Sequence, residues 1–234
     1  MEIGEKIADN VALVGSDRLS GTGDCDVYAI QYAVGKVCLI DAGVSSFKRI
    51  YENICQVFKE KGKNKPEITH LFLTHCHIDH IGAAHQVQEM FPHLTIIAHA
   101  WDTAAIEGRP GTEKMTAASW YGVNYQPIKI TCSINTDNLE IKLDDVVLTI
   151  LHTPGHTPGS ISIVYNHPKI GKILFGQDVH GPFMSEFNSN VEDWQRSMKL
   201  LLAQEPDILC EGHYGIIKGR DSVRKFIESQ LHQH

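Results

Sequence analysis

Three histidines and one aspartate lie within six residues of the chain, in the run His75-Cys76-His77-Ile78-Asp79-His80. Neutral imidazole and ionised carboxylate are the side chains that bind zinc, iron or manganese. If this segment stays extended, His75 and His77 point the same way and reach one ion, while Cys76 points away from them. Asp79 and His80 follow where the chain turns into a helix, so they project in another direction. This spacing favours two adjacent metal ions over one.

Further candidate ligands follow predicted strands. The apolar run 68–73 predicts a buried strand that ends at the first cluster. His156 lies in a loop rich in proline and glycine, and Asp178 and His213 each follow a short apolar run. Because loops on a rigid scaffold commonly supply a functional site, we expect these three residues to join the first cluster.

The order and separation of these residues resemble the five-motif signature of the metallo-β-lactamase superfamily, from Asp41 to His213. The resemblance implies an α+β fold, a four-layer αββα sandwich with the site at one end of two sheets, and a single domain over residues 1–234. The implied ligands of a first metal ion are His75, His77 and His156, and those of a second ion are Asp79, His80 and His213.

Two further aspartates receive roles from the same resemblance. Asp178 is similar to the carboxylate that bridges the two ions in this family. Asp41, at the end of a predicted strand, is similar to the aspartate that orients a ligand imidazole.

The chemistry implied by such a centre is hydrolysis. Two divalent ions about 3.5–4 Å apart can share a hydroxide at neutral pH. The first hypothesis is therefore a binuclear metal-dependent hydrolase, in which this bridging hydroxide attacks an ester, thioester or lactone of a small molecule. Asp79 is the catalytic candidate, because it can pass the proton of the hydroxide to the leaving group. Zinc is the first expectation for both ions, and iron and manganese are the alternatives.

The resemblance also favours one branch of the superfamily. The segment 153–159 and Asp178 are similar to glyoxalase II and the acyl-homoserine-lactone lactonases. The lactamases proper usually carry cysteine where Asp178 stands, so antibiotic hydrolysis is disfavoured. Glyoxalase II carries a helical C-terminal domain for glutathione, whereas only 21 residues follow His213, which argues against a glutathione thioester.

Two other hypotheses belong to different functional classes. Persulfide dioxygenases share these motifs but use a single iron, held by two histidines and an aspartate, to activate oxygen. The third hypothesis is a non-catalytic, metal-bound binding module. Metal content and oxygen dependence distinguish the dioxygenase from the hydrolase.

Substrate contacts are expected around the mouth of the site. His180 lies two residues after Asp178, and Tyr121 and Tyr214 are candidate donors to an oxyanion. Two of the three tryptophans fall in an aromatic-rich, helical insertion at about 100–125. This insertion could form a substrate wall or a partner surface, and the second use would make a homodimer.

Bulk composition excludes several kinds of partner. The formal net charge is −7 and the sequence pI is about 6.0, which argues against a basic face for nucleic acid. No apolar run approaches the roughly 18 residues of a membrane span. The six cysteines are scattered and the N-terminus shows no secretory signal, so the expected location is the cytoplasm.

The coarse secondary structure agrees with a layered fold. A series of predicted strands followed by a helix occurs twice, which suggests two sheet-plus-helix halves packed sheet to sheet. The expected helices run over about 47–61, 81–90, 191–203 and 221–232. The histidines outside the motifs are expected to be packed or surface residues: His70, His85, His93, His99, His152 and His167.

Overall fold

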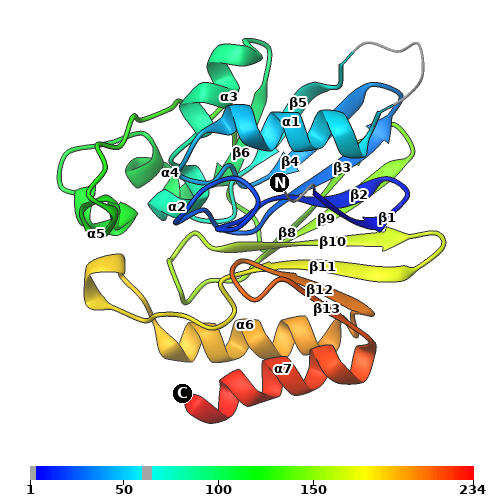
Figure 1. Ribbon diagram of the computed structural model, residues 1–234. Helices are drawn as coiled ribbons and strands as arrows, with labels where there is room; N and C mark the ends of the chain where they lie inside the picture. The colour runs from blue at the N-terminus through cyan, green and yellow to red at the C-terminus, as the bar shows by residue number, and fades with distance from the viewer. Residues whose placement is uncertain (1–3, 60–64) are drawn as a thin grey trace.

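Two β-sheets lie face to face, and helices cover the outer face of each sheet (Figure 1). The computed structural model describes residues 4–59 and 65–234. The first sheet has the strand order β1-β2-β3-β4-β5-β6-β7, and the second has the order β13-β12-β11-β10-β9-β8. These layers confirm the predicted αββα sandwich.

The strands of the first sheet are β1 (Glu5–Ala8), β2 (Val11–Gly15), β3 (Val27–Ala33), β4 (Lys36–Ile40), β5 (Glu67–Phe72), β6 (Thr95–His99) and β7 (Cys132–Ile134). Those of the second sheet are β8 (Asn138–Leu143), β9 (Val146–His152), β10 (Ile161–His167), β11 (Gly171–Gln177), β12 (Ile208–Glu211) and β13 (Ile216–Lys218). The helices are α1 (Phe47–Val57), α2 (Ile78–Ile81), α3 (Ala84–Met90), α4 (Ala100–Ile106), α5 (Ala118–Tyr121), α6 (Val191–Ala203) and α7 (Arg220–Gln233), with 3₁₀ turns η1 (Glu113–Thr116) and η2 (Ser185–Phe187).

Buried side chains alternate between the two faces of each strand and form three apolar layers, one between the sheets and one under the helices on each outer face. In β4, Val37 and Leu39 pack against the helices outside the first sheet, while Cys38 and Ile40 face the second sheet. In β11, Phe175 faces the first sheet and Leu174 packs on the side of α6 and α7. Successive side chains of a strand point to opposite faces, so strands buried on both faces read as continuous apolar runs.

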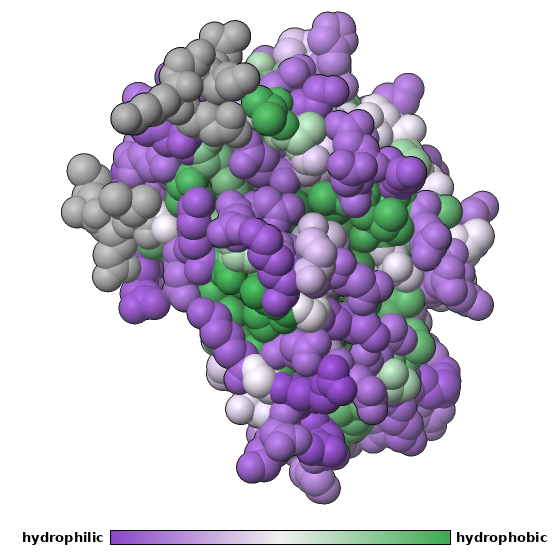
Figure 2. Space-filling model, turned by 90° about the vertical axis from the view of Figure 1, so that its right-hand side faces the viewer, coloured by the Kyte–Doolittle hydropathy of each residue, from purple (hydrophilic) through white to green (hydrophobic). Residues whose placement is uncertain are grey.

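The ends of several strands meet at one end of the sandwich. Strand β4 pairs with β5 in parallel, and β11 pairs with β12 in parallel, so the carboxyl ends within each pair lie together. The short elements α2, α4 and α5 gather at the same end, on the left of Figure 1. Figure 2 views the molecule from the opposite end and shows mostly hydrophilic residues, with hydrophobic residues gathered in a few smaller patches.

Two predicted helices have different bounds in the structure. The first predicted helix, 47–61, ends as α1 at Val57, and residues 60–61 lie outside the described part of the chain. The prediction of a single helix over 81–90 was wrong, because α2 ends at Ile81 and α3 begins at Ala84, with a break at Ala83. The Ala83 N–H donates to the carbonyl of Gly43 at 2.9 Å and leaves the helical hydrogen-bond ladder there. Strands β1, β7 and β13 are short and were not predicted.

No helix in the described ranges is both long enough and apolar enough to cross a membrane.

Candidate metal centre

The first cluster sits in a loop between a strand and a helix. Strand β5 ends at Phe72, and His77 is the residue that caps the start of α2. The Nδ1 of His75 lies 3.1 Å from the hydroxyl of Thr74, which leaves its Nε2 for another partner. His75 and His77 contact each other edge to face, with ring centroids 4.6 Å apart. The imidazole rings of His75 and His77 therefore lie side by side in the site.

Loop 153–160 adds His156 to these two rings. Its Nδ1 lies 2.9 Å from the carbonyl oxygen of Pro182, so its Nε2 faces His77. The Nε2 of His156 lies 3.3 Å from Oδ2 of Asp178, and the Nε2 of His75 lies 3.8 Å from the same oxygen. Ligand atoms of His75, His77, His156 and Asp178 all lie within 4.8 Å of one another, and all four residues are buried.

A second group adjoins the first. Asp79, His80 and His213 also bring ligand atoms within 4.8 Å of one another. The Nε2 of His213 lies 3.2 Å from Oδ2 of Asp79 and 3.4 Å from Oδ1 of Asp178. Since Oδ2 of Asp178 faces the first group and Oδ1 faces the second, this carboxylate lies between the two groups.

The donor set fits metal ions. Buried nitrogens of His75, His77 and His80 and the buried Oδ1 of Asp178 have no hydrogen-bond partner among the described residues. Buried polar atoms in folded proteins are nearly always hydrogen-bonded. Four such atoms that converge without hydrogen bonds form a site that could hold metal ions.

Asp41 fixes the orientation of one of these rings. Its Oδ2 lies 2.8 Å from Nδ1 of His80, and its Oδ1 accepts the Thr74 N–H at 2.8 Å. The Nε2 of His80 is thereby aimed at Asp178. Asp41 has a φ of 61°, in the left-handed region that is uncommon for non-glycine residues.

Protonation differs between the two groups. Burial holds the pKa of His75 and of His77 well below 6.5, so both rings are neutral. Burial also opposes the charged forms of His80 and His213, but nearby carboxylates raise the pKa of His80 well above 6.5 and that of His213 to about 10. A cation that binds to these two imidazoles must replace their protons.

A small pocket of about 190 Å³ opens onto both groups. Its walls are formed by His77, Asp79, Ala117, Trp120, Tyr121, Asp178, His180, Pro182, Phe187 and His213. Phe187 packs on His77 with a centroid distance of 4.3 Å, and Trp120 packs on Phe187 at 5.0 Å. The segment 100–125 therefore supplies part of an aromatic wall beside the predicted ligands.

Two of the three predicted substrate contacts line this pocket, and the third lies outside it. His180 lines the pocket, and its Nδ1 lies 2.9 Å from Oε1 of Glu211. Tyr121 also lines it, and burial, together with the negative charge of Asp79, raises the pKa of its hydroxyl. Tyr214 lies outside this pocket, with its ring 5.0 Å from that of His180.

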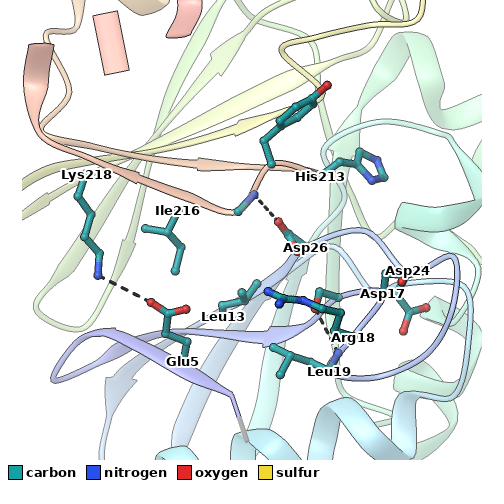
Figure 3. A pocket seen from close by; sticks show the side chains of 13 residues that line it. Glu5, Leu13, Asp17, Arg18, Leu19, Asp24, Asp26, His213, Ile216 and Lys218 are labelled. Carbon is teal, nitrogen blue, oxygen red and sulfur yellow. Dashed lines mark hydrogen bonds and ion pairs between the residues drawn. The ribbon is translucent and has the colours of Figure 1, made fainter. Parts of the chain in front are cut away.

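A second cavity of about 830 Å³ lies beyond His213, between the loop 16–26 and β13 (Figure 3). Tyr214 lines this cavity. Asp26 holds the turn after His213, because its Oδ2 accepts the Gly215 N–H at 2.8 Å. Burial raises the pKa of Asp26 to about 7.

Two buried carboxylates at the site were missed by the sequence reasoning. Glu211 accepts the backbone N–H of His213 at 2.7 Å and that of Tyr214 at 3.0 Å. Its position at the end of a strand, two residues before His213, was a usable signal. Asp102 lies in the first turn of α4, where acidic residues are common for other reasons, so the sequence carries no signal for it.

Comparisons with known proteins agree with this geometry. A family model described as the metallo-beta-lactamase superfamily matches residues 20–213. A probable metallo-hydrolase of Methanocaldococcus jannaschii is 32% identical over 146 residues, which are 62% of this chain and 65% of that protein. A hydroxyacylglutathione hydrolase of Haemophilus influenzae is 33% identical over 109 residues, which are 45% of this chain and 49% of that protein. The chain thus spans less than two thirds of the length of either relative.

Solved structures show the same fold. A motif mutant of a metallo-beta-lactamase from Cronobacter sakazakii superposes with a TM-score of 0.79 at 19% identity, covering 100% of this chain and 95% of that one. At this identity the similarity concerns the fold.

Proposed function

The chain belongs to the metallo-β-lactamase superfamily, and we propose that it is a metal-dependent hydrolase that uses two divalent ions to hydrolyse an ester, thioester or lactone of a small molecule. The observation that carries this proposal is the set of buried ligand atoms without hydrogen bonds at His75, His77, His80 and Asp178. Two groups of such atoms on either side of one carboxylate suit a pair of ions better than a single ion.

The ligands divide between the two positions. His75, His77 and His156 would hold the first ion, and Asp79, His80 and His213 the second, with Asp178 shared. When bound there, such a pair would supply a hydroxide nucleophile at neutral pH and would polarise the carbonyl of the substrate. We propose zinc for both positions, because imidazole nitrogens and carboxylate oxygens are among its usual ligands.

Asp79 is the proposed catalytic acid and base. Its carboxylate lines the pocket, and its Oδ2 lies 3.2 Å from His213. From this position it can hold the proton of the nucleophile and pass it to the leaving group. In the absence of metal, nearby His80 and His213 lower the pKa of Asp79 in spite of its burial, which keeps the carboxylate ionised and available as a ligand.

His180 and Tyr121 are the proposed contacts to the substrate. The carboxylate of Glu211 holds Nδ1 of His180, so the other ring nitrogen is available to the pocket. Tyr121 also lines the pocket and carries a hydroxyl. Donors fixed in this way can stabilise the charge that develops on a carbonyl oxygen. Trp120 and Phe187 would exclude water from the acyl group of the substrate.

The relatives support an acyl-bearing substrate, since one of them is named a hydroxyacylglutathione hydrolase. The test is a panel of a simple lactone, a thioester and an aryl ester, assayed with zinc-loaded protein and with the same protein after chelation. Hydrolysis that requires metal and fails after chelation supports the proposal. Absence of hydrolysis on all three compounds by protein that holds two ions would contradict it.

A further inference from the structure

Asp102 is a buried carboxylate outside the predicted ligand set. It lies in the first turn of α4, at the start of the segment 100–125, and has 0% exposure. Its Oδ2 accepts the backbone N–H of Cys76 at 2.9 Å and the hydroxyl of Thr157 at 2.6 Å. Its Oδ1 accepts the backbone N–H of Gly159 at 2.7 Å. A buried carboxylate is costly unless it is hydrogen-bonded in this way.

The donors belong to the two loops that carry the first group of histidines. Cys76 lies between His75 and His77, and Thr157 directly follows His156. One carboxylate on a third element therefore joins the loop 74–77 to the loop 153–160. The distance between these loops sets how closely His156 approaches His77, whose facing ring nitrogens lie 2.9 Å apart.

Gly159 shows that this junction is built for close approach. A Cβ at position 159 would lie 2.6 Å from the carboxyl carbon of Asp102, a distance that folded proteins do not tolerate. The absence of a side chain at Gly159 therefore lets its backbone N–H reach the carboxylate of Asp102. Ser160 completes the junction, because its hydroxyl accepts the Thr157 N–H at 3.1 Å.

We propose that Asp102 is a positioning residue for the first metal site, setting the affinity of His75, His77 and His156 for their ion separately from that of the second site. This inference rests on the proposed metal centre. It also gives the segment 100–125 a second role. Its first helix, α4, carries Asp102 and so holds the two ligand loops together, while later residues of the segment line the pocket. Partners that orient metal ligands typically contribute about 10- to 100-fold in metal affinity.

The second group has its own buried carboxylate, which provides a matched comparison. Glu211 also has 0% exposure, and it accepts the N–H of His213 at 2.7 Å. Its other oxygen accepts the N–H of Val179, next to Asp178, at 2.9 Å. Glu211 thus joins the loops around Asp178 and His213, as Asp102 joins those around His77 and His156.

The experiment compares Asp102→Asn with Glu211→Gln. Each change keeps the size of the side chain but replaces an acceptor oxygen by an NH₂ group, so at least one backbone or hydroxyl donor is left without a partner. Each variant and the wild type are equilibrated with zinc held at a fixed free concentration by a chelator. Zinc per chain is then measured, and anomalous diffraction gives the occupancy of each position.

We expect Asp102→Asn to weaken zinc binding at the first position by about 10- to 100-fold while the second position keeps its occupancy. Glu211→Gln should weaken binding mainly at the second position, because Glu211 holds the backbone N–H of His213. Thr157→Val is a milder variant, because it removes one hydroxyl donor and keeps the carboxylate. It should lower affinity at the first position by about threefold to tenfold. If Asp102→Asn does not fold, as judged by thermal unfolding with excess zinc, Thr157→Val carries the test.

Equal loss at both positions in Asp102→Asn, or unchanged occupancy of the first position in folded Asp102→Asn and Thr157→Val, would overturn the proposal. Failure of the proposed function looks different. In that case wild-type protein binds fewer than two ions or hydrolyses nothing, while the first position can still respond to Asp102→Asn.

Discussion

The Oδ1 of Asp178 lies 3.2 Å from the Nε2 of His80, and neither buried atom has a hydrogen bond among the described residues. The other oxygen of Asp178 lies 3.3 Å from His156 in the opposite group. Asp178 is therefore the side chain that the two ligand groups share.

Replacing Asp178 with alanine should remove both metal ions and abolish hydrolysis, because each group loses a ligand and the negative charge between the cations. Metal per chain, measured by elemental analysis after gel filtration, checks this. The matched control is His167→Ala. His167 lies at the far end of β10, about 20 Å along the strand from the site, and binds Asn10 at 3.0 Å. That variant should keep its metal, and retention of two ions by Asp178→Ala would contradict the assignment.

Replacing His180 with alanine should lower kcat/KM by about 10²- to 10³-fold without loss of metal, because it removes a fixed donor beside the reacting carbonyl. His93→Ala is the control, since His93 is exposed and lies outside the pocket lining. Kinetics on one ester and metal analysis of the same samples separate the two effects. A change in kcat/KM of less than twofold would remove His180 from the list of substrate contacts.

Replacing Trp120 with alanine should raise KM by about fivefold to tenfold, because the acyl group loses an apolar wall. Trp101 provides a closely matched control. It is 62% exposed, against 53% for Trp120, but it packs on His99 and His152, away from the pocket. Trp101→Ala should therefore leave KM within twofold. Equal effects of the two substitutions would show that Trp120 does not face the substrate.

Metal binding should release protons at neutral pH. The folded-state pKa of His213 is about 10, and that of His80 is also raised above 6.5, so both are protonated at pH 7 before a cation binds. Affinity at the second position should therefore fall as the pH falls from 10 to 7. Calorimetric titration in two buffers of different ionisation enthalpy measures the protons released, and a value of zero at pH 7 would contradict this.

The same shift has a consequence for the stability of chelated protein. A pKa raised in the folded state contributes stability that is fully present below the unfolded value, near 6.5, and is lost as the pH rises through about 10. Chelated protein should thus melt at a lower temperature at pH 10 than at pH 6.5. Bound zinc should reduce this difference, because the imidazole is then unprotonated throughout.

Much of the fold could be predicted because its signals are local. The apolar runs that became β4 and β11 are buried on both faces, and the residues that follow β4, β5 and β11 carry recognisable ligand chemistry. Asp102 could not be predicted, because its role depends on the packing of α4 against two loops distant in the sequence. The break at Ala83 was missed for a similar reason, since it depends on the carbonyl of Gly43.

The most direct test of the central claim is elemental analysis of protein purified without added metal, with the same sample assayed on a lactone and a thioester. The account predicts about two divalent ions per chain and metal-dependent hydrolysis of at least one of these compounds. One iron per chain, no hydrolysis and oxygen consumption with a persulfide would contradict it.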